Sequence, residues 1–284
     1  MQLRSGSSVG EFRAFSTGMA STLRLLRLPR NKFPSMLHQL VFEERLFRLT
    51  NDNWCVFGHG PREPAVVMGI SGKPEKLLNI ARCRDAELQV VKRFSGGGTV
   101  VVDDSTLFVS WVCHKDLLPH TISNSPPALM QWSADFYADA LARCRSPQAA
   151  AALPFGLQEH DYCFGTLKFG GNAQCITRER WVHHTSFLWD FDDQNMEFLT
   201  LPEKRPDYRA DRDHRDFLCR LKDHVEGGAG DADSSVFVDA VVGTAAQSFE
   251  CVWADFDAAE KQLEAASENA TSSQLRLSTR DVQL

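Results

Sequence analysis

The most informative stretch of this sequence reads Lys92-Arg93-Phe94-Ser95-Gly96-Gly97-Gly98-Thr99-Val100-Val101-Val102-Asp103. It places a basic pair and three glycines between two predicted strands. Consecutive glycines let backbone N–H groups approach an anion with no side chain in the way. Arg93 beside them offers a rigid fork of donors for a phosphate or a carboxylate. The stretch therefore predicts either an anion-binding loop or a flexible hairpin turn with solvated charges, and the residues alone leave both open.

A second stretch reads Asp161-Tyr162-Cys163-Phe164-Gly165-Thr166-Leu167-Lys168-Phe169-Gly170-Gly171-Asn172-Ala173-Gln174, and His183-His184-Thr185 follows it. If Lys168 faces the same cavity as the first loop, its ammonium can bridge a carboxylate and a nucleotide α-phosphate. Asp161 would then suit Mg²⁺, which prefers carboxylate, water and phosphate oxygens. The alternatives are an exposed turn lysine and two histidines that pack on opposite faces of a strand.

The pattern around these stretches predicts an α+β fold with a mixed, mainly antiparallel sheet flanked by helices. Amphipathic helices are expected at Met36 to Leu49 and Ala128 to Cys144. The connections between several strands are too short for crossover helices, so these strands should be antiparallel. The expected strands cover residues 54–57, 65–69, 88–94, 99–103, 107–113, 162–164, 172–176 and 184–189. Gly69-Ile70-Ser71-Gly72-Lys73-Pro74 falls short of a Walker nucleotide loop and is interpreted as a connecting loop.

Size and charge narrow the function classes. The chain has 284 residues, enough for one substantial catalytic domain, expected over residues 34–264. Its 31 Lys and Arg against 37 Asp and Glu give a net charge of -6, which disfavours nucleic-acid binding. No apolar run is long enough to cross a bilayer, so no membrane association is expected. The 8 cysteines contain no Cys-x-x-Cys pair and are interpreted as free thiols.

The two ends of the chain differ from this core in composition. Residues 1–33 carry five arginines and one acid, Glu11, which is typical of an organelle transit peptide or of a disordered basic segment. A mitochondrial location is therefore expected, with cytoplasm and plastid left open. Residues 265–284 are polar and are expected to form a disordered tail.

The order and separation of the two stretches resemble the lipoate-protein ligase A-like branch of the biotin and lipoate protein ligase superfamily. That family carries an Arg-Arg-x-Ser-Gly-Gly-Gly-Ala-Val-x-His-Asp stretch, an Asn-Asp pair, a Gly-x-Lys-x-x-Gly-x-Ala motif and a His-His-Gly. The corresponding residues here are 92–103, His160-Asp161, Lys168 through Ala173, and His183-His184-Thr185. The resemblance covers residues 36–220 and looks most like plant and algal members. It implies that family's catalytic-domain architecture.

The resemblance implies that ATP activates lipoate as lipoyl-AMP and that the lipoyl group passes to a carrier lysine. Carriers would be lipoyl domains of 2-oxoacid dehydrogenase E2 or glycine cleavage H type. Lys168 would be catalytic, and Asp161 would hold Mg²⁺. The residues expected to bind ATP or lipoyl-AMP are Arg93, Ser95, Gly96, Gly97, Gly98, Thr99, Asp103, Lys168, Gly170, Gly171, Asn172, Ala173 and His184.

Three departures from the family pattern leave alternatives open. Val102 replaces a histidine, His160 an asparagine and Thr185 a glycine. The chain also ends without the small accessory domain of many bacterial ligases, so a separate partner could supply it. One alternative is an octanoyl or lipoyl transferase with a cysteine thioester, for which Cys163 and Cys175 are the nearest candidates. The other is a lipoate- or carrier-binding subunit that has lost turnover.

Overall fold

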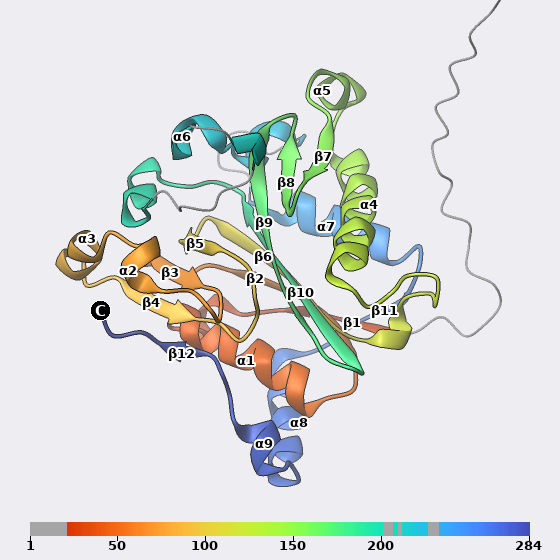
Figure 1. The fold of residues 1–284 in the computed structure, drawn as a ribbon. Coiled ribbons are helices and arrows are strands. Elements are labelled where there is room, and N and C mark those ends of the chain that lie inside the picture. Colours follow the sequence, from red (N-terminus) through yellow and green to blue (C-terminus); the bar gives the residue numbers. More distant parts are fainter. Residues whose placement is uncertain (1–21, 201–206, 210–211, 227–232) are drawn as a thin grey trace, which may run out of the picture.

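The computed structural model describes residues 22–200, 207–209, 212–226 and 233–284. Two β-sheets stand at its centre, with helices around them (Figure 1). The larger sheet has the order β11 (Glu250–Trp253), β1 (Thr22–Arg27), β2 (Asn53–His59), β6 (Thr106–His114), β10 (Arg180–Leu188), β9 (Leu167–Ile176), β8 (Asp161–Phe164) and β7 (Phe155–Gln158). The smaller has the order β12 (Arg280–Asp281), β4 (Gln89–Lys92), β3 (Ala65–Met68) and β5 (Thr99–Val102). The predicted α+β class is confirmed.

Strand pairing differs from the simplest expectation in the first half of the chain. The predicted strands at 88–94, 99–103 and 107–113 do not pair with one another. Instead, β4 and β5 lie on either side of β3, parallel and antiparallel to it, while β6 pairs with β2 and β10 in the other sheet. The triple-glycine segment therefore crosses the end of β3 and is not a hairpin between paired strands.

Helices cover both faces of the larger sheet. On one face, α4 (Pro126–Cys144) and α7 (Ser235–Ala245) pack over a core that contains the fully buried Trp111 and Trp181. On the other face lie α1 (Met36–Leu49) and α8 (Phe256–Glu268). The apolar side of α1 also contacts the smaller sheet, so this helix fills the space between the two sheets. The predicted helices at 36–49 and 128–144 are both confirmed.

The amino-terminal boundary at residue 33 is wrong. Residues 22–27 form β1, which pairs with β2 on one side and β11 on the other. Leu23, Leu25 and Leu26 are buried there, so this strand belongs to the central sheet. The remaining part of the predicted leader, residues 1–21, lies outside the described residues.

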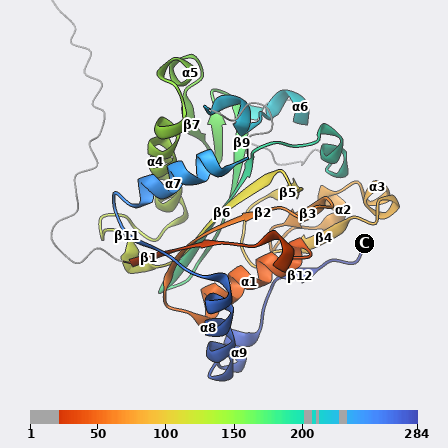
Figure 2. The ribbon, with the colours of Figure 1, turned by 180° about the vertical axis from the view of Figure 1, so that it is seen from behind.

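The structure also differs from the disorder expected for residues 265–284. After α8 the chain forms α9 (Ser272–Leu275), then follows α1 and ends as β12 on the edge of β4 (Figure 2). The buried carboxylate of Glu44 on α1 accepts the amides of Ser278 at 2.8 Å and Thr279 at 2.9 Å. These bonds and the strand pairing hold the tail in place despite its polar composition.

Short helices and turns complete the chain. Two of them, α2 and α3, connect β3 to β4, and α6 lies beside the start of β9 (Figure 1). Among the described residues no helix is both long and apolar enough to span a bilayer. The short helices are α2 (Pro74–Leu77), α3 (Ile80–Asp85), α5 (Pro147–Ala152) and α6 (His214–Phe217), and the 3-10 turns are η1 (Arg30–Lys32), η2 (Lys115–Leu117), η3 (Asp193–Phe198), η4 (Asp207–Arg209) and η5 (Leu221–His224).

Candidate functional site

The triple-glycine loop is held against the end of β3 by backbone hydrogen bonds. The Gly69 amide donates to the Gly98 carbonyl at 3.2 Å, and the Ile70 amide donates to the Ser95 carbonyl at 3.0 Å. Gly97 has a φ of 104°, and a Cβ there would lie 2.8 Å from Nη2 of Arg93. A Cβ on Gly98 would meet nothing within 4 Å. One glycine is therefore required by the fold, while its neighbour faces open space where an anion can approach.

Arg93 supports this loop from beneath. Its guanidinium is buried and donates to the side chain of Ser95 and to the carbonyls of Val67, Gly96 and Gly98. Burial lowers the pKa of Arg93 to about 10, so the group remains charged at neutral pH. All three guanidinium nitrogens are used by these acceptors. The sequence predicted that Arg93 touches the ligand, and the contacts favour an indirect role in shaping the loop.

Lys168 lies near the start of β9 and contacts Asp161 on the neighbouring strand. Its Nζ is 2.8 Å from Oδ1 of Asp161, and the two side chains are 21% and 11% exposed. The ammonium lies over Gly171, where a Cβ would be only 3.4 Å from Nζ. A lysine ammonium has three donors, so this single ion pair leaves Lys168 with capacity to bind a further oxygen.

Strand β9 brings the two predicted motifs together. The Gly96 amide donates to the Gln174 carbonyl at 3.0 Å, and a Cβ on Gly97 would lie 3.0 Å from the Asn172 carbonyl oxygen. The same strand carries Lys168 and Gly171 toward its other end. The glycine loop and the lysine therefore both contact β9, the loop at Asn172 and Gln174 and the lysine at Gly171.

Two of the three departures from the family pattern meet at Asn172. Its Nδ2 donates to the His160 carbonyl at 3.0 Å, and its Oδ1 accepts from the Thr185 hydroxyl at 2.7 Å. Asn172 is thus oriented by both positions. Val102, the third departure, lies 1% exposed in the apolar core between α1 and the smaller sheet.

The two adjacent histidines lie on opposite faces of β10, as predicted. Nδ1 of His184 lies 2.8 Å from Oε2 of Glu43 on α1 and 3.1 Å from the hydroxyl of Ser110. His183 faces the other side and contacts Tyr162 and Gln174. Burial lowers the pKa of His183 to about 3, so it is neutral. His184 was predicted to bind the ligand, and its buried contact with Glu43 connects α1 to the sheet.

Other predicted residues lie in supporting positions. Ser95 is fully buried under the loop, and Thr99 begins β5 opposite Met68. A Cβ on Gly170 would lie 3.0 Å from the ring of Tyr162, so this glycine allows close packing. Ala173 is 8% exposed and faces Gly97.

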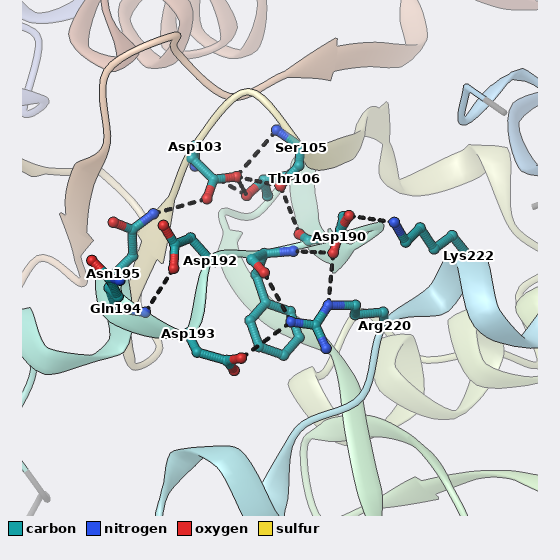
Figure 3. Close-up of polar contacts among 11 residues, drawn as sticks. Asp103, Ser105, Thr106, Asp190, Asp192, Asp193, Gln194, Asn195, Arg220 and Lys222 are labelled. Atoms are coloured by element: carbon teal, nitrogen blue, oxygen red, sulfur yellow. Dashed lines mark hydrogen bonds and ion pairs between the residues drawn. The ribbon is translucent and has the colours of Figure 1, made fainter. Parts of the chain in front are cut away.

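Asp103 lies at the opposite end of β5 from the glycine loop. Its carboxylate accepts from the amide and hydroxyl of Ser105, and Oδ2 accepts from Asn195 at 3.0 Å (Figure 3). Nearby, the carboxylate of Asp190 holds both Arg220 and Lys222 (Figure 3). We call Asp190, Arg220 and Lys222 the Asp190 cluster. Asp103 therefore fixes the turn before β6 and does not accompany Lys168.

Tyr208 is a site residue that the sequence interpretation missed. Its hydroxyl donates to Oδ2 of Asp161 at 2.9 Å and accepts from the Cys163 thiol at 3.3 Å. Tyr208 lies in a stretch of alternating charges with no helical or strand period, so only the tertiary contact identifies it.

Among the described residues no group of side chains forms a magnesium site by itself. Asp161 was the predicted ligand, but one of its oxygens faces Lys168 and the other accepts from Tyr208. Nowhere in the described ranges do three His, Cys, Asp or Glu side chains gather around a possible ion. We therefore assign no step to a metal held by these residues.

The cysteine candidates for a thioester are unsuited to that role in this conformation. Cys163 is buried, and burial raises its pKa to about 11. Burial also raises the pKa of Cys175. A thiol nucleophile reacts as its thiolate, and these environments disfavour the thiolate.

Comparisons with known proteins identify the family and the fold of this chain. The model of the lipoyl protein ligase A/B catalytic domain matches residues 35–249. A relative from Plasmodium falciparum, named inactive lipoate-protein ligase 2, is 26% identical over 241 residues, which are 66% of this chain and 61% of that protein. The chain thus spans less than two thirds of the length of this relative.

Two solved structures share the fold. One is a lipoate-protein ligase A bound with ATP, with a TM-score of 0.61, 15% identity, and coverage of 90% of this chain and 99% of that one. The other is the bipartite lipoate protein ligase of Thermoplasma acidophilum with its E2 lipoyl domain. Its TM-score is 0.60 at 17% identity, covering 90% of this chain and 96% of that one.

Proposed function

This chain belongs to the lipoyl protein ligase A/B catalytic domain family, and from that premise we propose that it is an ATP-dependent lipoate-protein ligase. The observation that carries the proposal is the position of Lys168. Its ammonium is held by one carboxylate oxygen and lies along β9 from the glycine loop. A cation with free donors, on the strand that the glycine loop contacts, suits a site where negative charge develops on a phosphate.

The proposed reaction has two steps. The lipoate carboxylate attacks the α-phosphorus of ATP, a phosphorus–oxygen bond forms, and pyrophosphate leaves to give lipoyl-AMP. The amine of a carrier lysine then attacks the acyl carbon, an amide forms, and AMP leaves. Lys168 would neutralise oxygens of the carboxylate and the α-phosphate in both steps, and the glycine loop would hold the adenylate.

The acceptor that we propose is a lipoyl domain of E2 or H type. The Thermoplasma acidophilum structure, which pairs a bipartite ligase with its E2 lipoyl domain, supports this class of acceptor. It also supports the idea that a separate protein completes the activity of this chain. The amine of a domain lysine is the only nucleophile that the second step needs, so no enzyme thiol takes part.

A second candidate is a subunit that binds lipoate or its carrier without turnover. It is favoured by the name of the Plasmodium falciparum relative and by Thr185, the departure whose side chain contacts Asn172. The retained Lys168–Asp161 pair favours the ligase. The two candidates differ in one product, because only the ligase releases pyrophosphate.

The test mixes the protein with lipoate, magnesium and ATP, and an E2 lipoyl domain, and follows pyrophosphate and the mass of the domain. We expect Lys168→Ala to lower the rate by roughly 10²–10³-fold, the usual effect of removing one donor at a site of developing charge. Lys222→Ala is the matched control, since it also removes a lysine from an aspartate. Lipoate binding with no pyrophosphate, in the presence of any accessory protein, would establish the binding subunit instead.

A further inference from the structure

The contacts around Asp161 extend beyond its ion pair with Lys168. A continuous chain of polar groups runs from the Cys163 thiol to the Tyr208 hydroxyl, then to the Asp161 carboxylate and the Lys168 ammonium. The three contacts measure 3.3, 2.9 and 2.8 Å. Because Tyr208 occupies Oδ2, the carboxylate is fixed with Oδ1 directed at the ammonium.

Tyr208 is itself held firmly against β8 and β9. Its ring packs on Phe217 with centroids 5.4 Å apart, and its carbonyl accepts from Nη2 of Arg212 at 2.7 Å. Nη1 of Arg212 donates to the carbonyl of Thr166, two residues before Lys168. A few residues later, the Cys219 amide donates to the carbonyl of Lys168 at 2.9 Å. The segment that presents Tyr208 is thus attached to the strand that presents the lysine.

The hydroxyl of Tyr208 stays protonated at neutral pH. Burial raises its pKa well above the ordinary value, and the negative charge of Asp161 raises it further. It therefore acts as a neutral donor that orients the carboxylate without competing with Lys168 for its charge.

We propose that Tyr208 is a positioning residue, whose hydroxyl fixes the Asp161 carboxylate and thereby keeps the Lys168 ammonium over Gly171, beside the glycine loop. This inference rests on the proposed function for its catalytic consequence, but the geometry that it describes exists without substrate. Tyr208 does not touch the reacting atoms and acts through Asp161.

The test compares three single variants of the full chain and one double variant. Tyr208→Phe removes the hydroxyl and keeps the ring packed on Phe217. Tyr162→Phe is the matched control, because it removes another buried hydroxyl from the adjacent strand. That hydroxyl contacts Ser133 and His183 and is not bonded to Asp161. Asp161→Asn removes the charge that holds the ammonium.

The first readout is the rate at which Lys168 is reductively methylated, followed by peptide mass spectrometry in the absence of substrate. We expect Tyr208→Phe to accelerate this labelling severalfold, and Tyr162→Phe to leave it at the wild-type rate. Adding Tyr208→Phe to Asp161→Asn should have no further effect, since the two residues act in series. Unchanged labelling in Tyr208→Phe, or equal changes in both tyrosine variants, would overturn the proposal.

The second readout is the rate of pyrophosphate release. Tyr208→Phe should lower kcat by about tenfold with little change in KM for ATP, because a hydrogen bond to a charged group is worth roughly that factor. A rise in KM alone would refute a positioning role. If no variant, the wild type included, releases pyrophosphate, the proposed function fails while the labelling experiment still decides the role of Tyr208.

Discussion

Lys168 and Lys222 both contact an aspartate, but their surroundings differ. Lys168 is paired with one oxygen of Asp161, while the other oxygen binds a neutral tyrosine hydroxyl. Lys222 shares Asp190 with Arg220, which also reaches the carboxylate of Asp193 and the carbonyl of Phe191 (Figure 3). The first lysine lies over the backbone of Gly171, whereas the second joins segments of the framework.

The difference teaches that an ion pair alone does not mark a site. What distinguishes Lys168 is that no second cation shares its carboxylate and that its ammonium lies over Gly171, a residue without a side chain. Arg93 shows that a residue of the predicted motif can have a supporting role. Its guanidinium donates hydrogen bonds to the loop itself.

The largest effect on stability is expected from Arg93→Met. It removes the buried group that donates to the Ser95 hydroxyl and to the carbonyls of Val67 and Gly96, so we expect a loss of about 3 kcal/mol in the free energy of unfolding, measured with urea. Lys92→Met, at the neighbouring partly exposed position, should change stability by less than about 0.5 kcal/mol. If Arg93→Met weakened ATP binding at unchanged stability, Arg93 would be a ligand-contacting residue and not a support.

A smaller loss of stability is expected from Gly97→Ala in the glycine loop. Gly97→Ala forces a side chain into a φ of 104° and against Arg93, at a cost of about 1–3 kcal/mol. Gly98→Ala meets open space, so its free energy of unfolding should change by less than about 0.5 kcal/mol. Its methyl group should instead raise KM for ATP by covering the exposed amides. Equal stability losses in the two variants would contradict the different roles assigned to these glycines.

The smallest loss of stability is expected from Asp190→Asn in the Asp190 cluster. Burial alone would raise the pKa of Asp190, but hydrogen bonds from Lys222, the Phe191 amide and Arg220 hold it below its ordinary value of 3.8. Asp190→Asn should cost about 1 kcal/mol at neutral pH, since the cluster is partly exposed to solvent. It should leave pyrophosphate release unchanged.

The pH dependence of that loss follows from the lowered pKa of Asp190. A carboxyl with a depressed pKa in the folded state stabilises the protein above its unfolded pKa and loses this contribution as the pH falls through the folded value. The difference between wild type and Asp190→Asn should therefore persist near neutrality and shrink as the pH falls below 3.8. Urea unfolding at several pH values measures it, and a difference that grew with acidity would refute the assigned pairing.

Much of the fold follows from local patterns. The helices at 36–49 and 128–144 were predictable because apolar residues recur at helical spacing between clear stop signals. The strand at 22–27 was missed because its arginines suggested a leader, although its leucines are buried. The ordered tail was missed because the buried acceptor that holds it, Glu44, lies far away in the sequence.

The family resemblance, the α+β class and the residue types of the two glycine motifs could all be read from the sequence, because they depend on local order and spacing. The role of each residue emerged only from the folded chain. Arg93 donates to the loop beneath which it is buried, Asp103 lies at the far end of β5, and Tyr208 contacts Asp161. The physical reason is that hydrogen-bond partners are chosen by proximity in space, and here each partner comes from a segment that no local pattern connects.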